Sequence, residues 1–483
     1  MKLKILIFIY ISAVFQLSAQ NKIWQFATEK FDQPGNIASD TAANKYVIMR
    51  LDQKGCLYKL DADGNELWHK ADLNWNPTAI KVKGNAFYIT GSFKTGWNPS
   101  GSTIFTAVGE ADFFLAKYDL QGNNIWVKTA GSTSEDWAEC IVMDELENIY
   151  VSGKYYGNMS FQKGILTHSG EGDLFFVKYS KNGDEKWIKR IGSSLIDNLY
   201  NLCWFPQKNE LLLNAYIQVG TNLGNGLFTS DNTTITVIYD TSGKPLQIIN
   251  NVNNMQLLGI EPAGTSVYWH TGLDYYDSSG VISKYNGNYT LQWTRKVRKG
   301  QKKILFMKDQ IVLYGTSPKI VNMVVRSMSY MSRYNVGGNM LSDDSLSLKA
   351  TFHYVEPLAN QLWITGSFTD TLNLPGSPAL YSKGDRDLFV FVMDNNSAGV
   401  NISNKFIEGI ILYPNPVTEM IHLDKRAYNY QCEIISMDGR NLNIPVIPVD
   451  VTYTMDVSEL NPGIYFLRLT SDQGIQTIKF IKL

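Results

Sequence analysis

Histidine and cysteine are scarce in this sequence, whose 483 residues include five histidines and four cysteines. No histidine stands in an H-E-x-x-H pattern, and no two cysteines have the C-x-x-C spacing of zinc or redox sites. The G-x-S-x-G nucleophile elbow and the phosphate-binding glycine loop are also missing. We therefore expect no metal site, no catalytic centre encoded by a local motif, and cysteines that are buried single thiols.

Charge of one sign and helical periodicity are scarce as well. The formal net charge is -1 and neither half of the chain is strongly basic, so nucleic acid is not an expected partner. Aromatic residues, in contrast, reach 12%, with 27 tyrosines and 38 glycines. This composition favours an all-β protein of two or three domains.

One apolar run stands at the N-terminus and has the layout of a secretory signal peptide over residues 1–19. Lys2 and Lys4 precede an apolar stretch at residues 3–15, and Ala19 closes a small-residue cleavage site. No later window reaches the ~18 apolar residues of a membrane span. The first cysteine, Cys56, lies far from the cleavage point, so lipid attachment there is not expected.

A repeat organises residues 20–394. An apolar strand ending in Lys-Tyr-Asp is followed by a Gly/Asn turn and a strand with tryptophan, as in "DFFLAKYDLQGNNIWVKTAG" (112–131) and "DLFFVKYSKNGDEKWIKRIG" (173–192). Aligned landmarks recur 46 to 61 residues apart, which is room for four strands and their loops. The landmarks are Leu60, Tyr118, Tyr179, Tyr239, Tyr285, Tyr334 and Met393.

Each repeat also contains a second hairpin, clearest at residues 138–155, 78–93 and 356–368. Four-stranded units repeated in this way predict an all-β, seven-bladed β-propeller, with six or eight blades left open because the middle repeats are degenerate. The Trp strand at residues 21–30 lacks a predecessor, and the strand at 387–399 lacks a following Trp strand. We expect these two to pair and close the ring.

The repeat resembles the bacterial beta-propeller repeat family, in which a G-x-x-D-x-F-x-x-K-Y-D strand precedes G-N-x-W and then G-N-x-Y-V-T-G. Residues 110–119, 122–126 and 147–153 match this pattern. The resemblance implies a fold and no particular reaction.

The C-terminal part has a different pattern. Residues 395–408 are polar and are interpreted as a linker, and alternating strands with Pro-Asn-Pro, Asp-Gly and Asn-Pro-Gly turns predict a small β-sandwich over 409–483. This segment resembles the type A sorting domain of type IX (Por) secretion. The residues that carry the resemblance include Pro414, Asn415, Pro416, Gly439, Gly463, Tyr465, Lys479 and Lys482.

The second resemblance implies a route and partners. The protein would cross the periplasm, pass an outer-membrane translocon, lose the tag, and be secreted or held on the outer cell surface, frequently on lipopolysaccharide. Whether it is released or anchored stays open.

Five residues outside the repeat positions are candidate ligand-binding residues. The strand order predicts that one rim of the propeller carries Trp75, Trp97, Asp136, Trp137 and Asp197. A mixture of aromatic and carboxylate groups at such a rim suits sugar stacking or peptide contacts, although the same residues could instead cover neighbouring blades.

Other repeated residues are assigned structural roles. Asp112, Asp173 and Asp387 are predicted to cap loops, and the recurring tryptophans are predicted to pack between blades. Residues 61–66, "DADGNE", resemble part of a calcium loop, but they lack the bidentate Glu and fit a hairpin turn better. Calcium is left as the one possible cofactor.

The leading functional hypothesis is a non-catalytic, surface-displayed propeller that binds a glycan or protein. The alternatives are a secreted polysaccharide hydrolase or lyase with Asp136 and Asp197 as acid and base, and a scaffold without a ligand. Propeller enzymes can assemble sites from distant blades, so missing motifs do not decide between them.

Overall fold

The computed structural model describes most of the chain. The described residues are 22–26, 32–224, 227–229, 233–250, 256–261, 264–271, 279–298, 301–307, 310–321, 324–347, 350–358, 361–372, 374, 379–383, 386–394, 412–413, 417–423, 431–436, 440–442, 444, 446–449, 452–471 and 474–483. They contain strands and turns but no α-helix, and hence no helix able to cross a membrane. Contacts divide the chain into residues 1–396 and 397–483, and the predicted signal peptide and linker lie outside the described part.

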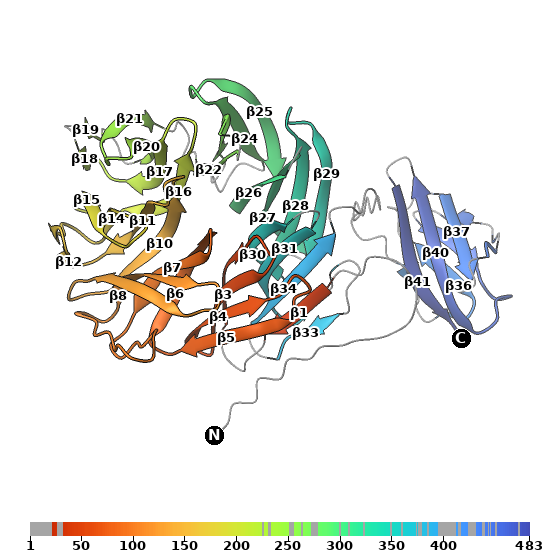
Figure 1. The fold of residues 1–483 in the computed structure, drawn as a ribbon. Helices are drawn as coiled ribbons and strands as arrows, with labels where there is room; N and C mark the ends of the chain where they lie inside the picture. The colour runs from red at the N-terminus through yellow and green to blue at the C-terminus, as the bar shows by residue number, and fades with distance from the viewer. Residues whose placement is uncertain are drawn as a thin grey trace. The chain divides into compact units, whose positions relative to one another are not determined.

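The first unit consists of antiparallel four-stranded sheets, and Figure 1 shows them following one another around a common centre. Seven such sheets are present in the described residues. The first three are β2 (Gln33–Ser39), β3 (Lys45–Leu51), β4 (Lys54–Leu60) and β5 (Glu66–Asp72); β6 (Trp75–Lys83), β7 (Ala86–Phe93), β8 (Asp112–Asp119) and β9 (Asn124–Ala130); and β10 (Asp136–Met143), β11 (Ile149–Tyr155), β14 (Asp173–Tyr179) and β15 (Glu185–Ile191).

The remaining sheets continue the same order. They are β16 (Asn198–Phe205), β17 (Glu210–Ile217), β20 (Thr233–Asp240) and β21 (Pro245–Asn250); β22 (Gln256–Ile260), β23 (Ser266–Thr271), β24 (Ser279–Asn286) and β25 (Leu291–Arg298); β26 (Gln301–Met307), β27 (Gln310–Val321), β28 (Val324–Asn335) and β29 (Met340–Ser347); and β30 (Ala350–Leu358), β31 (Gln361–Phe368), β34 (Asp387–Asp394) and β1 (Lys22–Phe26). Three short hairpins extend the loops: β12 (Met159–Phe161) with β13 (Gly164–Leu166), β18 (Asn222–Gly224) with β19 (Leu227–Phe228), and β32 (Thr371–Leu372) with β33 (Leu380–Tyr381).

The sheets are joined into a ring by strands from the two ends of the unit. The first strand of each sheet contacts the first strand of the next, and β30 contacts β2. Strand β1 pairs antiparallel with β34, with Trp24 opposite Val390 and Gln25 opposite Phe389. The side chain of Gln25 also donates to Asp387 Oδ2 at 2.6 Å. The predicted all-β propeller is confirmed, and β1 pairs with β34 as predicted.

Because each sheet is a meander, its loops fall at two ends. We call "turn face" the end with the turns between strands one and two and between strands three and four. The "crossover face" carries the loops between strands two and three and the connections to the next sheet. Several of the turns are built on Asp side chains: Asp119 accepts the backbone N–H groups of Gln121 and Asn123 at 3.0 and 2.8 Å.

The possible calcium loop at residues 61–66 is a turn of this kind. Asp61 accepts the backbone N–H groups of Asp63 and Asn65 at 2.9 and 2.8 Å, and the amide of Asn65 at 2.8 Å. These bonds hold the pKa of Asp61 below its ordinary value. The oxygens that would ligate calcium therefore serve the turn.

Tryptophans of the fourth strands pack on the glycine turns of the next sheet, an arrangement we call the Trp–Gly joint. These glycines have φ between +79° and +87°, which other residues rarely adopt, and an added Cβ would lie 3.0 to 3.2 Å from the indole. The glycine is thus required both by the turn and by the ring beside it. The pairs are Trp68 with Gly122, Trp126 with Gly183, Trp187 with Gly243, and Trp293 with Gly338.

The lysine of the Lys-Tyr-Asp motif makes a second connection, the Lys–Tyr joint. The ammonium of Lys178 lies 5.0 Å from the ring centroid of Tyr150 and donates to Thr241 O in the next sheet at 2.9 Å. Lys59 repeats this with Tyr46 and Leu120 O, at 5.3 and 2.7 Å. The charge-assisted hydrogen bond therefore ties neighbouring sheets together at the turn face, while the cation–π contact holds the ammonium against a tyrosine of its own sheet.

The second unit is a small β-sandwich, as predicted. One sheet has the order β35 (Leu412–Tyr413), β36 (Met420–Leu423), β39 (Thr452–Asp456) and β38 (Val446–Val449), and the other has β37 (Gln431–Ser436), β40 (Gly463–Ser471) and β41 (Gly474–Lys482). Their inner faces share one core, to which Ile421 and Met455 contribute from the first sheet and Leu467 and Phe480 from the second.

Candidate functional site

Two of the predicted binding residues belong to the hydrophobic core. Trp75 is 5% exposed and Trp97 is 2% exposed, and the Trp97 ring lies 4.5 Å from Phe114. The loop that carries Trp97 folds back through a bridge to Phe105 and packs against its own sheet. Trp75 donates its indole N–H to Gly55 O at 2.7 Å. Both tryptophans therefore cover parts of the propeller core, and they are not placed to stack on a ligand.

The two predicted carboxylates are also buried and serve their own loops. Asp136 accepts the backbone N–H groups of Ser132 and Tyr156, and Asp197 accepts those of Ser193 and Gln218. Both are 0% exposed, and burial raises the pKa of Asp136 to about 6 and that of Asp197 above its ordinary value. A polymeric substrate has no access to these groups in this structure.

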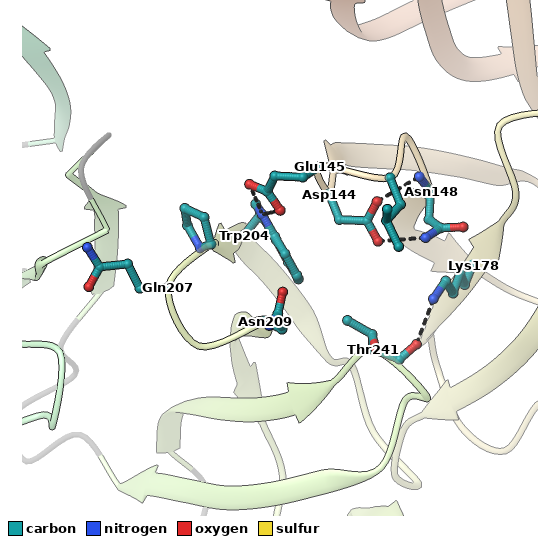
Figure 2. Close-up of a pocket in the computed structure, with 10 residues that line it drawn as sticks. Asp144, Glu145, Asn148, Lys178, Trp204, Gln207, Asn209 and Thr241 are labelled. Carbon is teal, nitrogen blue, oxygen red and sulfur yellow. Dashed lines mark hydrogen bonds between the residues drawn. The ribbon is translucent and has the colours of Figure 1, made fainter.

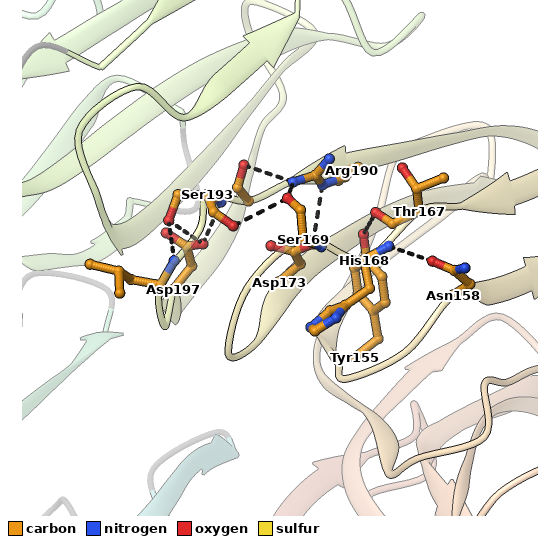
Figure 3. Close-up of polar contacts among 11 residues, drawn as sticks. Tyr155, Asn158, Thr167, His168, Ser169, Asp173, Arg190, Ser193 and Asp197 are labelled. Atoms are coloured by element: carbon orange, nitrogen blue, oxygen red, sulfur yellow. Dashed lines mark hydrogen bonds and ion pairs between the residues drawn. The ribbon is translucent and has the colours of Figure 1, made fainter.

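The loops around Asp197 form one polar network, drawn in Figure 3. Asp173 accepts the backbone N–H of Ser169 at 2.9 Å and pairs with Arg190 Nε at 3.1 Å. Asp112 accepts the N–H groups of Val108 and Gly109 in the same way. These contacts agree with the predicted capping role of the repeated aspartates and give the crossover face a fixed backbone.

Trp137 differs from the other predicted residues because it reaches the surface. Its ring stacks on Tyr156, with centroids 5.4 Å apart and planes 29° apart, and its indole N–H donates to Glu139 at 3.1 Å. Burial raises the pKa of the Glu139 carboxyl, while this hydrogen bond lowers it. The indole is thus held in one orientation before any ligand arrives.

Trp137 lines a pocket of about 390 Å³ on the crossover face, which we call the Trp137 pocket. Groups from the first three sheets meet there: the guanidinium of Arg50, the amides of Asn74 and Asn76, and the carboxylate of Glu135. The buried edge of Trp75 forms part of the wall. Donors, acceptors and an aromatic face therefore converge in an open cavity.

A larger pocket of about 740 Å³ lies on the turn face between the third and fourth sheets (Figure 2). Trp204 stands there with its indole N–H 3.0 Å from both oxygens of Glu145, beside Gln207 and Asn209. This site was not predicted from the sequence. Trp204 lies in a first strand and not at the repeated fourth-strand position, which is the signal that could have found it.

The sorting-signal residues are partly described. Gly463 opens β40, and the Tyr465 ring stacks on Phe480 at 5.7 Å while its hydroxyl donates to Asn461 O at 2.9 Å. Lys482 is buried at the end of β41, and the backbone of Lys479 lies in the same strand. Pro414, Asn415, Pro416 and Gly439 lie outside the described residues.

Residues 411–483 match the family model described as "Secretion system C-terminal sorting domain". This segment is a type IX sorting domain. The protein is therefore secreted by the type IX system to the cell surface or beyond, as predicted. Interaction with the type IX machinery follows from the same domain.

Other proteins match this chain at low sequence identity. The uncharacterized WD repeat-containing protein L264 of Acanthamoeba polyphaga mimivirus is 26% identical over 204 residues, which are 38% of this chain and 14% of that protein. The crystal structure of polysaccharide lyase Uly1 aligns with 75% of this chain and 90% of its own at 7% identity and TM-score 0.44. The β-propeller domain of the trilobed protease from Pyrococcus furiosus aligns with 71% and 95% at 6% identity and TM-score 0.33. At these identities the structural likenesses concern the fold alone.

Proposed function

We propose that this secreted protein is a non-catalytic binding protein whose ligand occupies the Trp137 pocket. The observation that supports the proposal is the indole of Trp137, fixed by Tyr156 and Glu139 at the edge of an open polar cavity. A pre-oriented aromatic surface loses little conformational entropy on binding.

The lining of the pocket favours a saccharide. A sugar presents C–H groups on one face and hydroxyls around its edge, which match an indole face beside the side chains of Asn74, Asn76 and Arg50. The asparagine amides can both donate and accept hydrogen bonds, and the guanidinium donates. A peptide with polar side chains is the second ligand class that this lining would accept.

Catalysis is not part of the proposal. Asp136 and Asp197, the carboxylates considered for an acid and base, are 0% exposed and bonded to their own loops. An enzyme acting through them would need both loops to open.

A glycan array probed with the mature protein tests the proposal. We expect binding of one saccharide class, about a tenfold loss or more on Trp137→Ala, and a smaller loss on Trp137→Phe, which keeps a ring. Ile125→Ala, which truncates an exposed apolar side chain in β9, is the matched control and should bind normally. Full binding by Trp137→Ala would place the ligand elsewhere.

The enzymatic alternative has its own test. The mature protein would be incubated with the polysaccharides that it binds, and reducing ends and unsaturated products would be measured. We expect no product above that from heat-denatured protein. Product formation that Asp136→Asn abolishes would overturn the non-catalytic proposal.

We also propose that the sorting domain leads to attachment on surface lipopolysaccharide. Fractionation of cells that produce the full chain should place it in the outer membrane. A variant without residues 411–483 should accumulate in the periplasm, and a full-length protein found free in the medium would contradict attachment.

A further inference from the structure

A third cavity opens where the first strands of five successive sheets converge at the turn face. We call it the channel mouth. It has a volume of about 460 Å³ and is distinct from the Trp137 pocket, which lies on the opposite face. Its walls come from β6, β10, β16, β22 and β26, so it exists only in the assembled ring.

Most of the side chains that line the channel mouth are apolar. They are formed by Val82, Val142, Met143, Leu202, Cys203, Trp204, Leu258, Gly259, Ile260, Ile304 and Phe306, with Asn201 as the one neutral polar side chain in the described lining. The Asn201 amide donates to Leu257 O and Leu258 O, at 3.1 and 3.2 Å. The asparagine amide is therefore used within the wall, and the apolar side chains remain to contact an apolar part of a ligand.

The ammonium groups of Lys81 and Lys83 belong to the lining of the channel mouth. Lys81 and Lys83 are two residues apart in β6, so their side chains leave the strand on the same side. Neither forms a hydrogen bond or an ion pair with the residues that the structure describes, in contrast to Lys178 and Lys59 at the joints. The described lining contains no Asp or Glu. Two positive charges thus lie beside apolar side chains, in a described lining that has no carboxylate.

Other charged groups of the channel do not occupy this position. Lys303 donates to His353 O at 2.8 Å, and its ammonium lies 3.7 Å from the centroid of the Tyr354 ring. Glu356 in β30 interacts with Lys81 electrostatically, yet it does not line the cavity and makes no ion pair with it. Lys81 and Lys83 therefore remain available to a ligand.

We propose that the channel mouth binds a carboxylate carried on an apolar chain. The carboxylate would accept hydrogen bonds from Lys81 and Lys83, and the chain would lie against Met143, Ile260 and Phe306. Such a group occurs in a free fatty acid and at the C-terminus of an apolar peptide. The site is independent of the saccharide proposal, because the two cavities share no residue.

Calorimetry on the full chain tests the proposal with sodium decanoate below its micelle concentration. We expect decanoate to bind about tenfold more tightly than decanol, and decyltrimethylammonium not to bind. An acetylated leucine-rich pentapeptide, as free acid and as amide, forms the second arm. Tighter binding of the pentapeptide acid than of decanoate would identify a peptide C-terminus as the source, and the reverse would identify a fatty acid.

The variants locate the site. Lys81→Met with Lys83→Met should weaken decanoate binding about tenfold or more without changing the affinity for decanol. Lys163→Met, in an exposed loop of the crossover face, is the control for the loss of positive charge. Lys81→Gln with Lys83→Gln repeats the test if the methionine variant unfolds at a lower temperature. Equal affinities for decanoate and decanol, or unchanged decanoate binding by the double variants, would overturn the proposal, while saccharide binding would be unaffected.

Discussion

The joint between the third and fourth sheets and the joint between the fourth and fifth sheets are built from different chemistry. At the first, Lys178 lies between the Tyr150 ring and Thr241 O, and Trp187 packs on Gly243. At the second, Leu212 and Ile238 occupy the positions equivalent to Tyr150 and Lys178. They are paired with each other and are 0% and 1% exposed. An apolar pair has replaced the cation–π pair.

At the second joint the aromatic residue comes from the turn of the following sheet and not from the fourth strand of the preceding one. Gln247 stands in register with Ile238, where the other sheet has Trp187 opposite Lys178. The turn of the fifth sheet has Tyr289 at φ +60°, where other turns have glycine, and its ring lies 6.2 Å from Phe205. The Tyr289 hydroxyl donates to Glu210 at 2.6 Å.

A buried polar pair completes the second joint. Trp269 Nε1 donates to Thr236 Oγ1 at 3.1 Å, and Leu257 N donates to Asn214 Oδ1 at 3.1 Å, both between the fourth and fifth sheets. The two joints show that the boundary between sheets must be closely packed and hydrogen-bonded, but that no particular set of residues is required. A repeat can therefore become unrecognisable in sequence while its sheet stays in place.

The largest effect is expected from placing the repeat lysine in the apolar joint. Ile238→Lys should lower the free energy of unfolding by about 3–4 kcal/mol, because its charge would be buried among Phe205, Leu257 and Trp269 without a partner. The reverse exchange, Lys178→Ile, should cost only about 1 kcal/mol. Urea unfolding followed by tryptophan fluorescence measures both, and equal losses would mean that the two joints are equivalent.

An intermediate effect on the free energy of unfolding is expected when the aromatic residue is moved from the turn of the fifth sheet to the fourth strand of the fourth sheet. Tyr289→Gly should cost about 2 kcal/mol through lost contacts with Phe205 and Trp269 and the lost bond to Glu210. Adding Gln247→Trp should recover about 1 kcal/mol by forming a Trp–Gly joint. The single variant Gln247→Trp completes the double-mutant cycle. Purely additive losses would show that the two positions do not interact.

The smallest effect separates backbone strain from packing at a Trp–Gly joint. Gly243 and Gly220 have nearly the same φ, +80° and +81°, but only an added Cβ at Gly243 would meet other groups, Lys189 Cε and, at 3.0 Å, the Trp187 ring. Gly220→Ala should therefore cost about 1 kcal/mol, and Gly243→Ala about 1 kcal/mol more. Thermal unfolding of the two variants measures the difference. Equal losses would assign the whole requirement for glycine to the turn.

The propeller could be predicted because its joints use local, repeated chemistry. The Lys-Tyr-Asp strand, the glycine turn and the Trp strand lie within 20 residues, as at 112–131, so one stretch of sequence shows them all. Ring closure could be predicted because the fragments around Trp24 and Phe389 each lack what the other supplies. The export route could be predicted because its motifs occur in order near the C-terminus.

The binding residues were harder to predict because their exposure depends on distant segments. Trp97 and Trp137 both lie in irregular positions of the sequence, yet Trp97 is covered by Phe105 and Phe93 while Trp137 stays at a pocket. The channel mouth could not be predicted at all, since its lining comes from five sheets at no fixed spacing.

The seam between β1 and β34 joins the first described residues of the unit to nearly the last. During synthesis the strand at 22–26 is made first, and it can pair with the strand at 387–394 only after that strand has been made. Every other sheet can assemble from one continuous stretch of chain, whereas the final sheet draws on both ends. The ring can therefore be completed only after β34 has been made, and any chain that ends before residue 387 keeps two unpaired strand edges.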